Sequence, residues 1–236
     1  MTIGRVVHER SNCSLSAYSC SRRGDLFEVL ELSDTKARIF ICDVMGHGVR
    51  AALVASTVSA LVGQLRDYLG DPSEFLCRLN RALRSRLEYY SEAPLFASAF
   101  YLLADLEKGE LRYANAGYPN PLRIHREQDR TDTYSLNGSK HAPALGLFDD
   151  AVYPTSHCEL SPHDTLLLFT DGLYEVEGPG GDIYDYQRLF EAVSKRELPA
   201  FQLCHEVIEK VQKFSAGRHF NDDACLVAME VGPIST

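Results

Sequence analysis

Acidic side chains recur in this sequence at points where a predicted strand ends. These residues are Asp25, Asp43, Asp171, Asp222 and Asp223. A carboxylate at the end of a strand is held rigidly, and a neighbouring glycine lets the backbone approach a ligand closely. If the strands converge, the carboxylates would repel one another at a cost of several kcal/mol unless a cation lay among them. A hard divalent cation, Mg²⁺ or Mn²⁺, is the natural counter-charge for such oxygen ligands.

The stretch around Asp43 combines a predicted strand, a glycine-containing loop and the start of a predicted helix. Residues 39–42 (Ile-Phe-Ile-Cys) predict a strand that delivers Asp43 to a loop containing Gly46 and Gly48, after which a long helical pattern begins. Alone, this turn is equally compatible with an aspartate that only caps the next helix. Because no Lys or Arg lies close in sequence to Asp43, Asp171 or Asp222, a local ion pair does not explain them.

Hydrophobic periodicity and turn signals predict strands and helices along the whole chain. The expected strands are 12–20, 26–32, 36–42, 95–106, 110–115, 121–125, 132–136, 158–160, 164–169 and 224–231, and the expected helices are 49–69, 72–87, 187–195 and 199–214. Apart from 132–136, the polar stretch 127–143 is expected to be a loop, and so is the glycine-rich stretch 175–183. No repeat or linker divides the chain, so we expect a single domain over residues 1–236.

Composition limits the class of protein. A chain of 236 residues with 45% hydrophobic residues can bury a large core. The net charge of −9 argues against a nucleic-acid partner, and no apolar run is long enough for a membrane span. The seven cysteines are odd in number and form no CxxC pair, which is typical of reduced thiols. We therefore expect a cytoplasmic protein that binds neither nucleic acid nor membrane.

Six short motifs together carry a resemblance to a known family. They are Gly24-Asp25, Asp43–Gly48 with Ala51-Ala52-Leu53, Tyr113–Gly117, Leu145–Leu147, Thr170–Glu175 and Asp222-Asp223. In this order they resemble the metal-dependent serine/threonine protein phosphatases of type 2C, and more narrowly the bacterial sporulation stage II E branch. Members of that branch dephosphorylate anti-sigma-factor antagonists. The resemblance covers nearly the whole chain.

The resemblance implies an α+β fold in which two antiparallel β-sheets pack face to face with helices on both outer sides. It also implies a site for two ions, Mn²⁺ or Mg²⁺, at one end of the sheets. By matching motif, Asp43 would bridge both ions, the main-chain carbonyl of Val44 would ligate one, and Asp171 and Asp222 would ligate the other. Asp25 would serve the Val44 side, directly or through water. Asp222 is preferred to Asp223 because the family pattern is an aspartate followed by Asp or Asn.

The activity implied is hydrolysis of a phosphoserine or phosphothreonine monoester by a water that two metals activate. The substrate would be an anti-sigma-factor antagonist or a similar protein of bacterial partner-switching signal transduction. An alternative is a regulatory pseudophosphatase that binds a partner without turnover, and a metal titration separates the two. A phosphorelay receiver domain fits less well, because the middle of this chain is β-rich. A cysteine phosphatase also fits less well, because this chain has no Cys-x5-Arg loop to bind the phosphate.

Four residues depart from the family pattern or leave their role open. Arg23 stands where the branch often has glycine, and either holds phosphoryl oxygens or faces solvent. Tyr118 stands where histidine is common. Met45 replaces the histidine proposed as general acid in eukaryotic relatives, so the leaving oxygen needs another proton source. His47 belongs to the loop of the bacterial branch, where a structural role is expected.

Overall fold

The computed structural model of the protein describes residues 6–10, 13–20, 24–46, 48–87, 95–127, 130–136, 142–194, 198–216 and 223–232, with the backbone alone at 6–10, 13–20 and 127. The chain divides into two compact units. Unit 1 consists of Met1–Arg22, Pro119–Asn137 and Ser161–Thr236, and unit 2 consists of Arg23–Tyr118 and Gly138–Leu160. Each unit therefore collects segments that are far apart in sequence. The expectation of a single domain over residues 1–236 stays a prediction.

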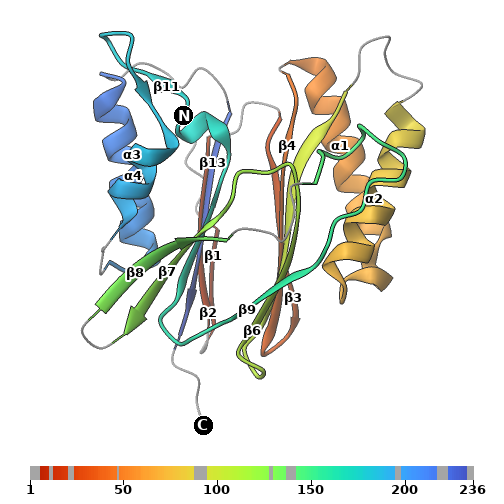
Figure 1. Cartoon of the computed structure of the whole chain (residues 1–236), viewed down its shortest axis with the longest axis horizontal. Helices are drawn as coiled ribbons and strands as arrows, with labels where there is room; N and C mark the ends of the chain where they lie inside the picture. Colours follow the sequence, from red (N-terminus) through yellow and green to blue (C-terminus); the bar gives the residue numbers. More distant parts are fainter. Residues whose placement is uncertain are drawn as a thin grey trace. The chain divides into compact units, whose positions relative to one another are not determined.

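Unit 2 contains a five-stranded antiparallel sheet in the order β3-β4-β5-β6-β9. Its strands are β3 (Leu26–Ser33), β4 (Lys36–Val44), β5 (Ala97–Asp105), β6 (Glu110–Ala116) and β9 (Ser156–Glu159). The helices α1 (Val49–Gln64) and α2 (Pro72–Leu87) lie side by side on one face of this sheet (Figure 1). Phe40, Cys42 and Val44 of β4 belong to the core beneath them. Since side chains alternate along a strand, Asp43 points to the opposite face.

The helices of unit 2 largely follow the predicted boundaries. Asp71 caps α2 as the sequence predicts, because its side chain accepts hydrogen bonds from the N–H groups of Ser73 (2.9 Å) and Glu74 (3.3 Å). The single helix predicted over 49–69 is wrong at its end. α1 stops at Gln64, Leu65 leaves helical geometry at φ −90° and ψ 22°, and a short 3-10 helix follows at Arg66–Tyr68.

Unit 1 contains a six-stranded antiparallel sheet in the order β1-β2-β13-β10-β7-β8. Its strands are β1 (Val6–Arg10), β2 (Cys13–Cys20), β13 (Ala224–Val231), β10 (Thr165–Phe169), β7 (Leu122–Glu127) and β8 (Arg130–Ser135). Strand β1 was not predicted. The polar stretch 127–143 also begins with more strand than expected, because β7 and β8 form a hairpin that reaches Glu127 and Arg130.

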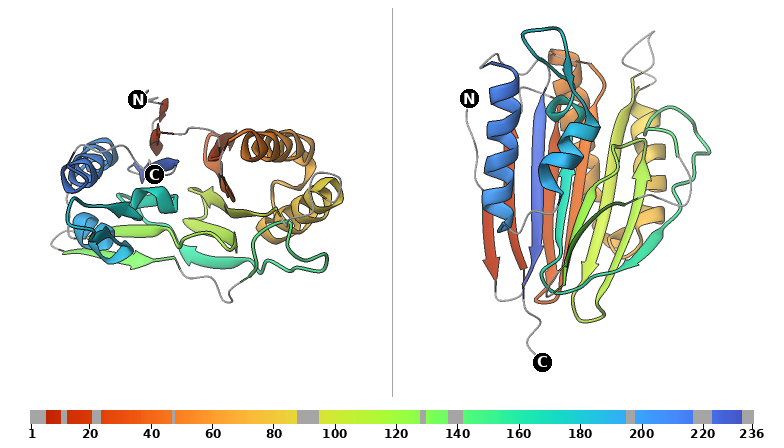
Figure 2. Two further views of the ribbon diagram at one scale, coloured as in Figure 1. Left: turned by 90° about the horizontal axis from the view of Figure 1, so that it is seen from above. Right: turned by 60° about the vertical axis from the view of Figure 1, so that its left-hand side comes forward.

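Two helices, α3 (Tyr186–Val193) and α4 (Ala200–Phe214), pack side by side in unit 1, as Figure 2 (right) shows. Leu203, Val207 and Val211 of α4 join a core with Leu167 and Leu226 of the sheet. The segment that follows Asp171 is more ordered than predicted. A 3-10 helix η2 (Asp171–Leu173) precedes a two-stranded ribbon, β11 (Val176–Glu177) and β12 (Ile183–Tyr184).

The protein is thus a mixed α+β structure with antiparallel sheets and several helices, which confirms the predicted class. The face-to-face packing of the two sheets stays a prediction. No helix in the described part of the chain is both long enough and apolar enough to cross a membrane.

Candidate metal centre

Asp25 directly precedes β3 and Asp43 lies in the neighbouring strand β4, so both are at the same end of the unit 2 sheet. Leu26 pairs with Cys42, so continuing the register by one residue sets Asp25 opposite Asp43. Directly opposed side chains of antiparallel strands have Cβ atoms about 5 Å apart. Burial raises the pKa of the Cys42 thiol, and the Asp43 and Asp25 carboxylates beside it raise that pKa further. Both carboxylates are therefore near enough to the Cys42 thiol to affect its pKa.

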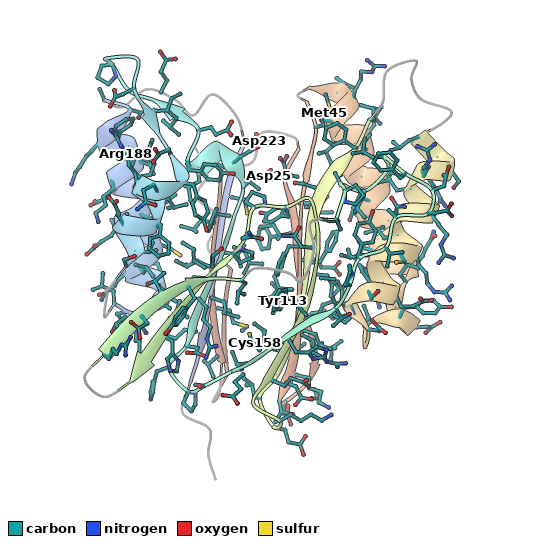
Figure 3. All side chains as sticks on the ribbon, in the orientation of Figure 1. Asp25, Met45, Tyr113, Cys158, Arg188 and Asp223 are labelled. Carbon is teal, nitrogen blue, oxygen red and sulfur yellow. The ribbon has the colours of Figure 1, made fainter. Side chains whose placement is uncertain are left out.

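Val44 ends β4, and the chain leaves the sheet immediately after it. The N–H of Met45 donates to the carbonyl of Phe96 (3.0 Å), which holds this point against β5. Gly46 and Gly48 follow with φ of 91° and 85°, a region that favours glycine, and α1 starts at the next residue. Asp25 and Met45 are labelled at this end of the unit in Figure 3. Arg23 and His47, whose roles the sequence left open, are outside the described residues.

Asp171 and Asp223 lie at the adjoining ends of two neighbouring strands of unit 1. Strand β10 ends two residues before Asp171, and β13 begins directly after Asp223. The strands are antiparallel, with Phe169 paired to Leu226, so these ends are side by side. The carbonyl of Asp171 accepts hydrogen bonds from the N–H groups of Tyr174 and Glu175, both at 2.8 Å. The backbone of Asp171 is thereby fixed at the start of η2.

Thr170 joins these two strand ends, a role that the sequence did not reveal. Its N–H donates to the carbonyl of Cys225 (3.1 Å), and its hydroxyl accepts from the N–H of Cys225 (2.8 Å). The same hydroxyl donates to the carbonyl of Asp223 (3.5 Å). The side chain is fully buried. The signal in the sequence was a lone hydroxyl at the end of an otherwise apolar strand, directly before Asp171.

Two of the six sequence motifs serve the structure of unit 2. Asn115 binds the backbone of Tyr118 twice, accepting from its N–H (2.7 Å) and donating to its carbonyl (2.9 Å). The buried side chain of Asn80 accepts from the N–H of Gly146 (2.8 Å) and donates to the carbonyl of Phe148 (2.8 Å). Gly146 has φ 89°, a region that favours glycine, and an added Cβ would lie 3.1 Å from the backbone oxygen of Leu95. These motifs anchor turns and bring no ligand.

The described donor atoms fit a hard cation. Asp25, Asp43 and the Val44 carbonyl in unit 2, and Asp171 in unit 1, offer oxygen atoms only, which is the donor set that Mg²⁺ and Mn²⁺ prefer. Asp222, the fifth predicted ligand, lies outside the described residues. Among the residues that the structure describes, no group of three His, Cys, Asp or Glu side chains gathers closely enough to hold a metal. The complete ligand set stays a prediction.

Curated proteins with related sequences are bacterial phosphatases. The chain is 28% identical over 209 residues to the phosphoserine phosphatase RsbP of Bacillus subtilis, covering 88% of this chain and 49% of that protein. It is 29% identical over 194 residues to the phosphoserine phosphatase RsbU of the same organism, covering 80% of this chain and 55% of that protein. The chain thus spans about half the length of these curated relatives.

Solved structures share the fold. The crystal structure of the RsbU and RsbW domains of Rv1364c from Mycobacterium tuberculosis superposes with a TM-score of 0.78 at 22% identity, covering 98% of this chain and 62% of that one. The catalytic domain of the serine/threonine protein phosphatase PstP, in complex with two manganese ions, superposes with a TM-score of 0.68 at 16% identity, covering 94% of this chain and 99% of that one. At such identities the likeness shows the fold alone.

A family model settles the relationship. The model of stage II sporulation protein E (SpoIIE) matches residues 33–232, which is most of the chain. The matched range contains Asp43, Asp171 and Asp222, and only Asp25 of the predicted ligands precedes it. The chain belongs to the SpoIIE family, the branch of the type 2C phosphatases that its motifs resemble.

Proposed function

We propose that this chain is a protein phosphatase domain that hydrolyses phosphoserine or phosphothreonine monoesters with a water activated by two divalent cations. The observation that carries the proposal is the position of Asp25, directly before β3, and Asp43, in β4, at the same end of the unit 2 sheet, in a chain of the SpoIIE family. The relatives RsbP and RsbU, which are named phosphoserine phosphatases, support the substrate chemistry. In this proposal residues 1–236 act as a single catalytic domain.

The proposed roles of the ligands follow from their chemistry and motif positions. Asp43 would serve both cations, while Asp25 and the Val44 carbonyl would hold one of them. Asp171 and Asp222 hold the other. All of these groups offer oxygen, which supports Mn²⁺ or Mg²⁺ rather than a softer metal. The two manganese ions bound by PstP, which shares the fold, are consistent with the number proposed.

The reaction needs no nucleophile from the protein. When bound, two divalent cations lower the pKa of a water and neutralise the oxygens of the phosphoryl group during in-line attack. The chain's own carboxylates hold and orient these ions. Buried thiols are poorly suited to the alternative of cysteine catalysis, because burial raises the pKa of Cys42 and raises that of Cys204 to about 12. A thiol with such a pKa is not a thiolate at neutral pH.

The proposed substrate is a phosphorylated anti-sigma-factor antagonist, or a similar protein of bacterial partner switching. The proposed location is the cytoplasm. No disulfide joins any two of the described cysteines, which are Cys42, Cys77, Cys158, Cys204 and Cys225, and this is consistent with a reducing compartment.

The test is manganese-dependent release of phosphate from a phosphoserine antagonist protein. Asp43→Asn keeps the size of the side chain and removes the bridging charge, so it is expected to abolish release. Asp34→Asn is the matched control, because Asp34 is exposed in the β3–β4 turn at the other end of the same hairpin. Asp43→Asn activity within a few-fold of the parent would refute the assignment.

Calorimetric titration with Mn²⁺ separates the proposal from the pseudophosphatase alternative. A phosphatase binds the metal and releases phosphate. A chain that binds the partner but shows neither turnover nor metal binding would be a pseudophosphatase.

A further inference from the structure

An open cavity of about 580 Å³ is lined by residues of unit 1, none of which is a predicted metal ligand. One wall is aromatic and consists of Tyr174, Tyr186 and Phe190. The polar part of the lining includes Asn120, Ser135 and Gln187 and is called the polar wall. These residues come from the β6–β7 connection, the end of β8, the turn after η2 and the helix α3. Only the fold brings these segments together.

The aromatic wall is rigid because its rings pack on one another. Tyr174 and Tyr186 meet edge to face, with centroids 5.9 Å apart and an interplanar angle of 88°. Phe169 of β10 packs against both rings at 6.0 Å. Ring pairs at these distances prefer such edge-to-face geometry. The wall is therefore preformed and does not need to be assembled by a ligand.

The polar wall is joined to the aromatic wall through one hydroxyl. The hydroxyl of Tyr186 lies 3.2 Å from the Ser135 hydroxyl, within hydrogen-bond distance, and donates to the carbonyl of Asn120 (3.4 Å). None of the described residues that line the cavity carries a charge. A charged ligand group would lose its hydration there without gaining an ion pair, at a cost that an uncharged group avoids. The lining thus selects an uncharged group with a large apolar surface.

Strand register sets the cavity at the same end of the unit 1 sheet as Asp171. Leu167 pairs with Leu122, and Leu122 pairs with Ser135. Ser135 therefore lies in the same cross-strand row as Leu167 of β10, four residues before Asp171. The N–H of Tyr174 also donates to the carbonyl of Asp171 (2.8 Å), so the aromatic wall begins in the same turn as this predicted ligand.

The lateral distance fits an extended peptide. Neighbouring strands are about 4.8 Å apart, so β8 lies about 10 Å from β10 across β7. Ser135 is in row with Leu167, four residues before Asp171, which adds about 13 Å along the strands. The separation is then about 16 Å, and an extended chain that advances about 3.3 Å per residue covers it in about five residues. A phosphoserine held at Asp171 would consequently place a neighbouring side chain of its own protein at the cavity.

We propose that this cavity is a specificity site that receives one large uncharged side chain, of the leucine or phenylalanine class, about four to six residues from the phosphoserine of the substrate. The inference rests on the proposed function and extends it by naming a feature of the substrate. A volume of about 580 Å³ is within the range of pockets that bind small ligands and accommodates such a side chain. Its walls are uncharged and preformed, which favours an apolar anchor.

The test uses a panel of synthetic phosphoserine peptides in an alanine background. Each peptide carries Leu, Phe, Glu or Lys at one position within six residues of the phosphoserine, on either side. Phosphate release is measured with Mn²⁺ for each peptide and for p-nitrophenyl phosphate, which has no flanking residues. For the parent chain we expect kcat/KM to rise about tenfold, mainly through KM, for Leu or Phe at one position.

Two variants fill the cavity without touching a predicted ligand. Gln187→Trp changes an exposed position of α3, where the side chain bonds only to Glu191 one turn along the same helix (2.9 Å). Ser135→Trp fills the cavity from β8. Tyr134→Trp is the matched control, because Tyr134 is the exposed neighbour of Ser135 and does not line the cavity. Both filling variants are expected to lose the preference and to keep the parent rate on p-nitrophenyl phosphate, while the control keeps both.

The outcomes separate this inference from the function on which it rests. A parent chain that hydrolyses the peptides with no positional preference, or filling variants that keep the preference, would overturn the specificity site alone. No release from any peptide or from p-nitrophenyl phosphate would overturn the proposed function, and this inference with it.

Discussion

The buried hydroxyl of Thr170 accepts a hydrogen bond of 2.8 Å from the backbone N–H of Cys225. This bond joins the residue before Asp171 to the second residue after Asp223. The Thr170 side chain, which is not a predicted ligand, thereby fixes the end of β10 next to Asp171 to the start of β13 next to Asp223. The relationship gives Thr170 a positioning role that can be tested separately from catalysis.

Thr170→Val keeps the shape of the side chain and removes its hydroxyl. It leaves the N–H of Cys225 without this acceptor, so we expect the free energy of unfolding to fall by about 1–3 kcal/mol. Urea denaturation measures this change, and calorimetry with Mn²⁺ measures the accompanying loss of metal affinity. Thr170→Ser retains the hydroxyl and should stay closer to the parent in both. A valine variant as stable as the serine variant would contradict the role.

If the proposed site forms, metal should stabilise the folded chain by mass action, because the unfolded chain does not hold the predicted ligands together. At a free metal concentration of 100 times Kd the expected gain is about 2.7 kcal/mol. Melting temperature should therefore rise with Mn²⁺ or Mg²⁺ and return to its starting value with chelator. In chelator, Asp43→Asn should be at least as stable as the parent, since the substitution relieves repulsion from Asp25. A melting temperature that stays unchanged at millimolar Mn²⁺ or Mg²⁺ would argue against the predicted metal site.

The ribbon after η2 packs against α3 and α4 through Gly178. A Cβ at Gly178 would lie 2.7 Å from Oδ1 of Asp182 and 3.1 Å from the ring of Phe214. The Phe214 ring is also covered by the Arg188 guanidinium, whose carbon lies 4.7 Å from the ring centroid (Arg188 is labelled in Figure 3). Gly178→Ala should therefore destabilise the protein by about 1–3 kcal/mol through overpacking.

Gly180→Ala is the matched control in the same turn. The nearest atom to its added Cβ is Oδ1 of Asp182 at 3.5 Å, an ordinary contact distance. We expect the melting temperature to fall for Gly178→Ala and to stay near the parent for Gly180→Ala. Equal melting temperatures for the two variants would show that the ribbon is not packed as described.

Burial raises the pKa of the Cys204 thiol from its ordinary value of 9.0 to about 12. Between these values the unfolded chain loses the thiol proton and the folded chain keeps it. The native state then binds more protons, so stability is fully present below pH 9 and falls as the pH rises toward 12, by at most about 1.4 kcal/mol per pH unit for one thiol. Cys204→Ala should flatten this decline, measured by urea denaturation between pH 8 and 11. An unchanged slope would contradict the burial effect.

Local sequence was sufficient for most of the secondary structure. The strand and turn around Asp43, the cap at Asp71 and the strand before Thr170 were predictable, because apolar periodicity and turn chemistry act over a few neighbouring residues. The predictions failed where local preference was weak. The polar residues near Glu127 and the glycines near Gly178 gave no strand signal, yet pairing with a neighbour made both segments extended.

The sequence by itself determined the family, the predicted ligands and the α+β class, because short motifs and hydrophobic periodicity are written in consecutive residues. Only the tertiary structure decided which residues meet across the chain. The opposition of Asp25 and Asp43 and the bond from Cys225 to Thr170 depend on strand register. Register is a property of a pair of strands, set by how their buried faces pack, and one strand alone does not contain it.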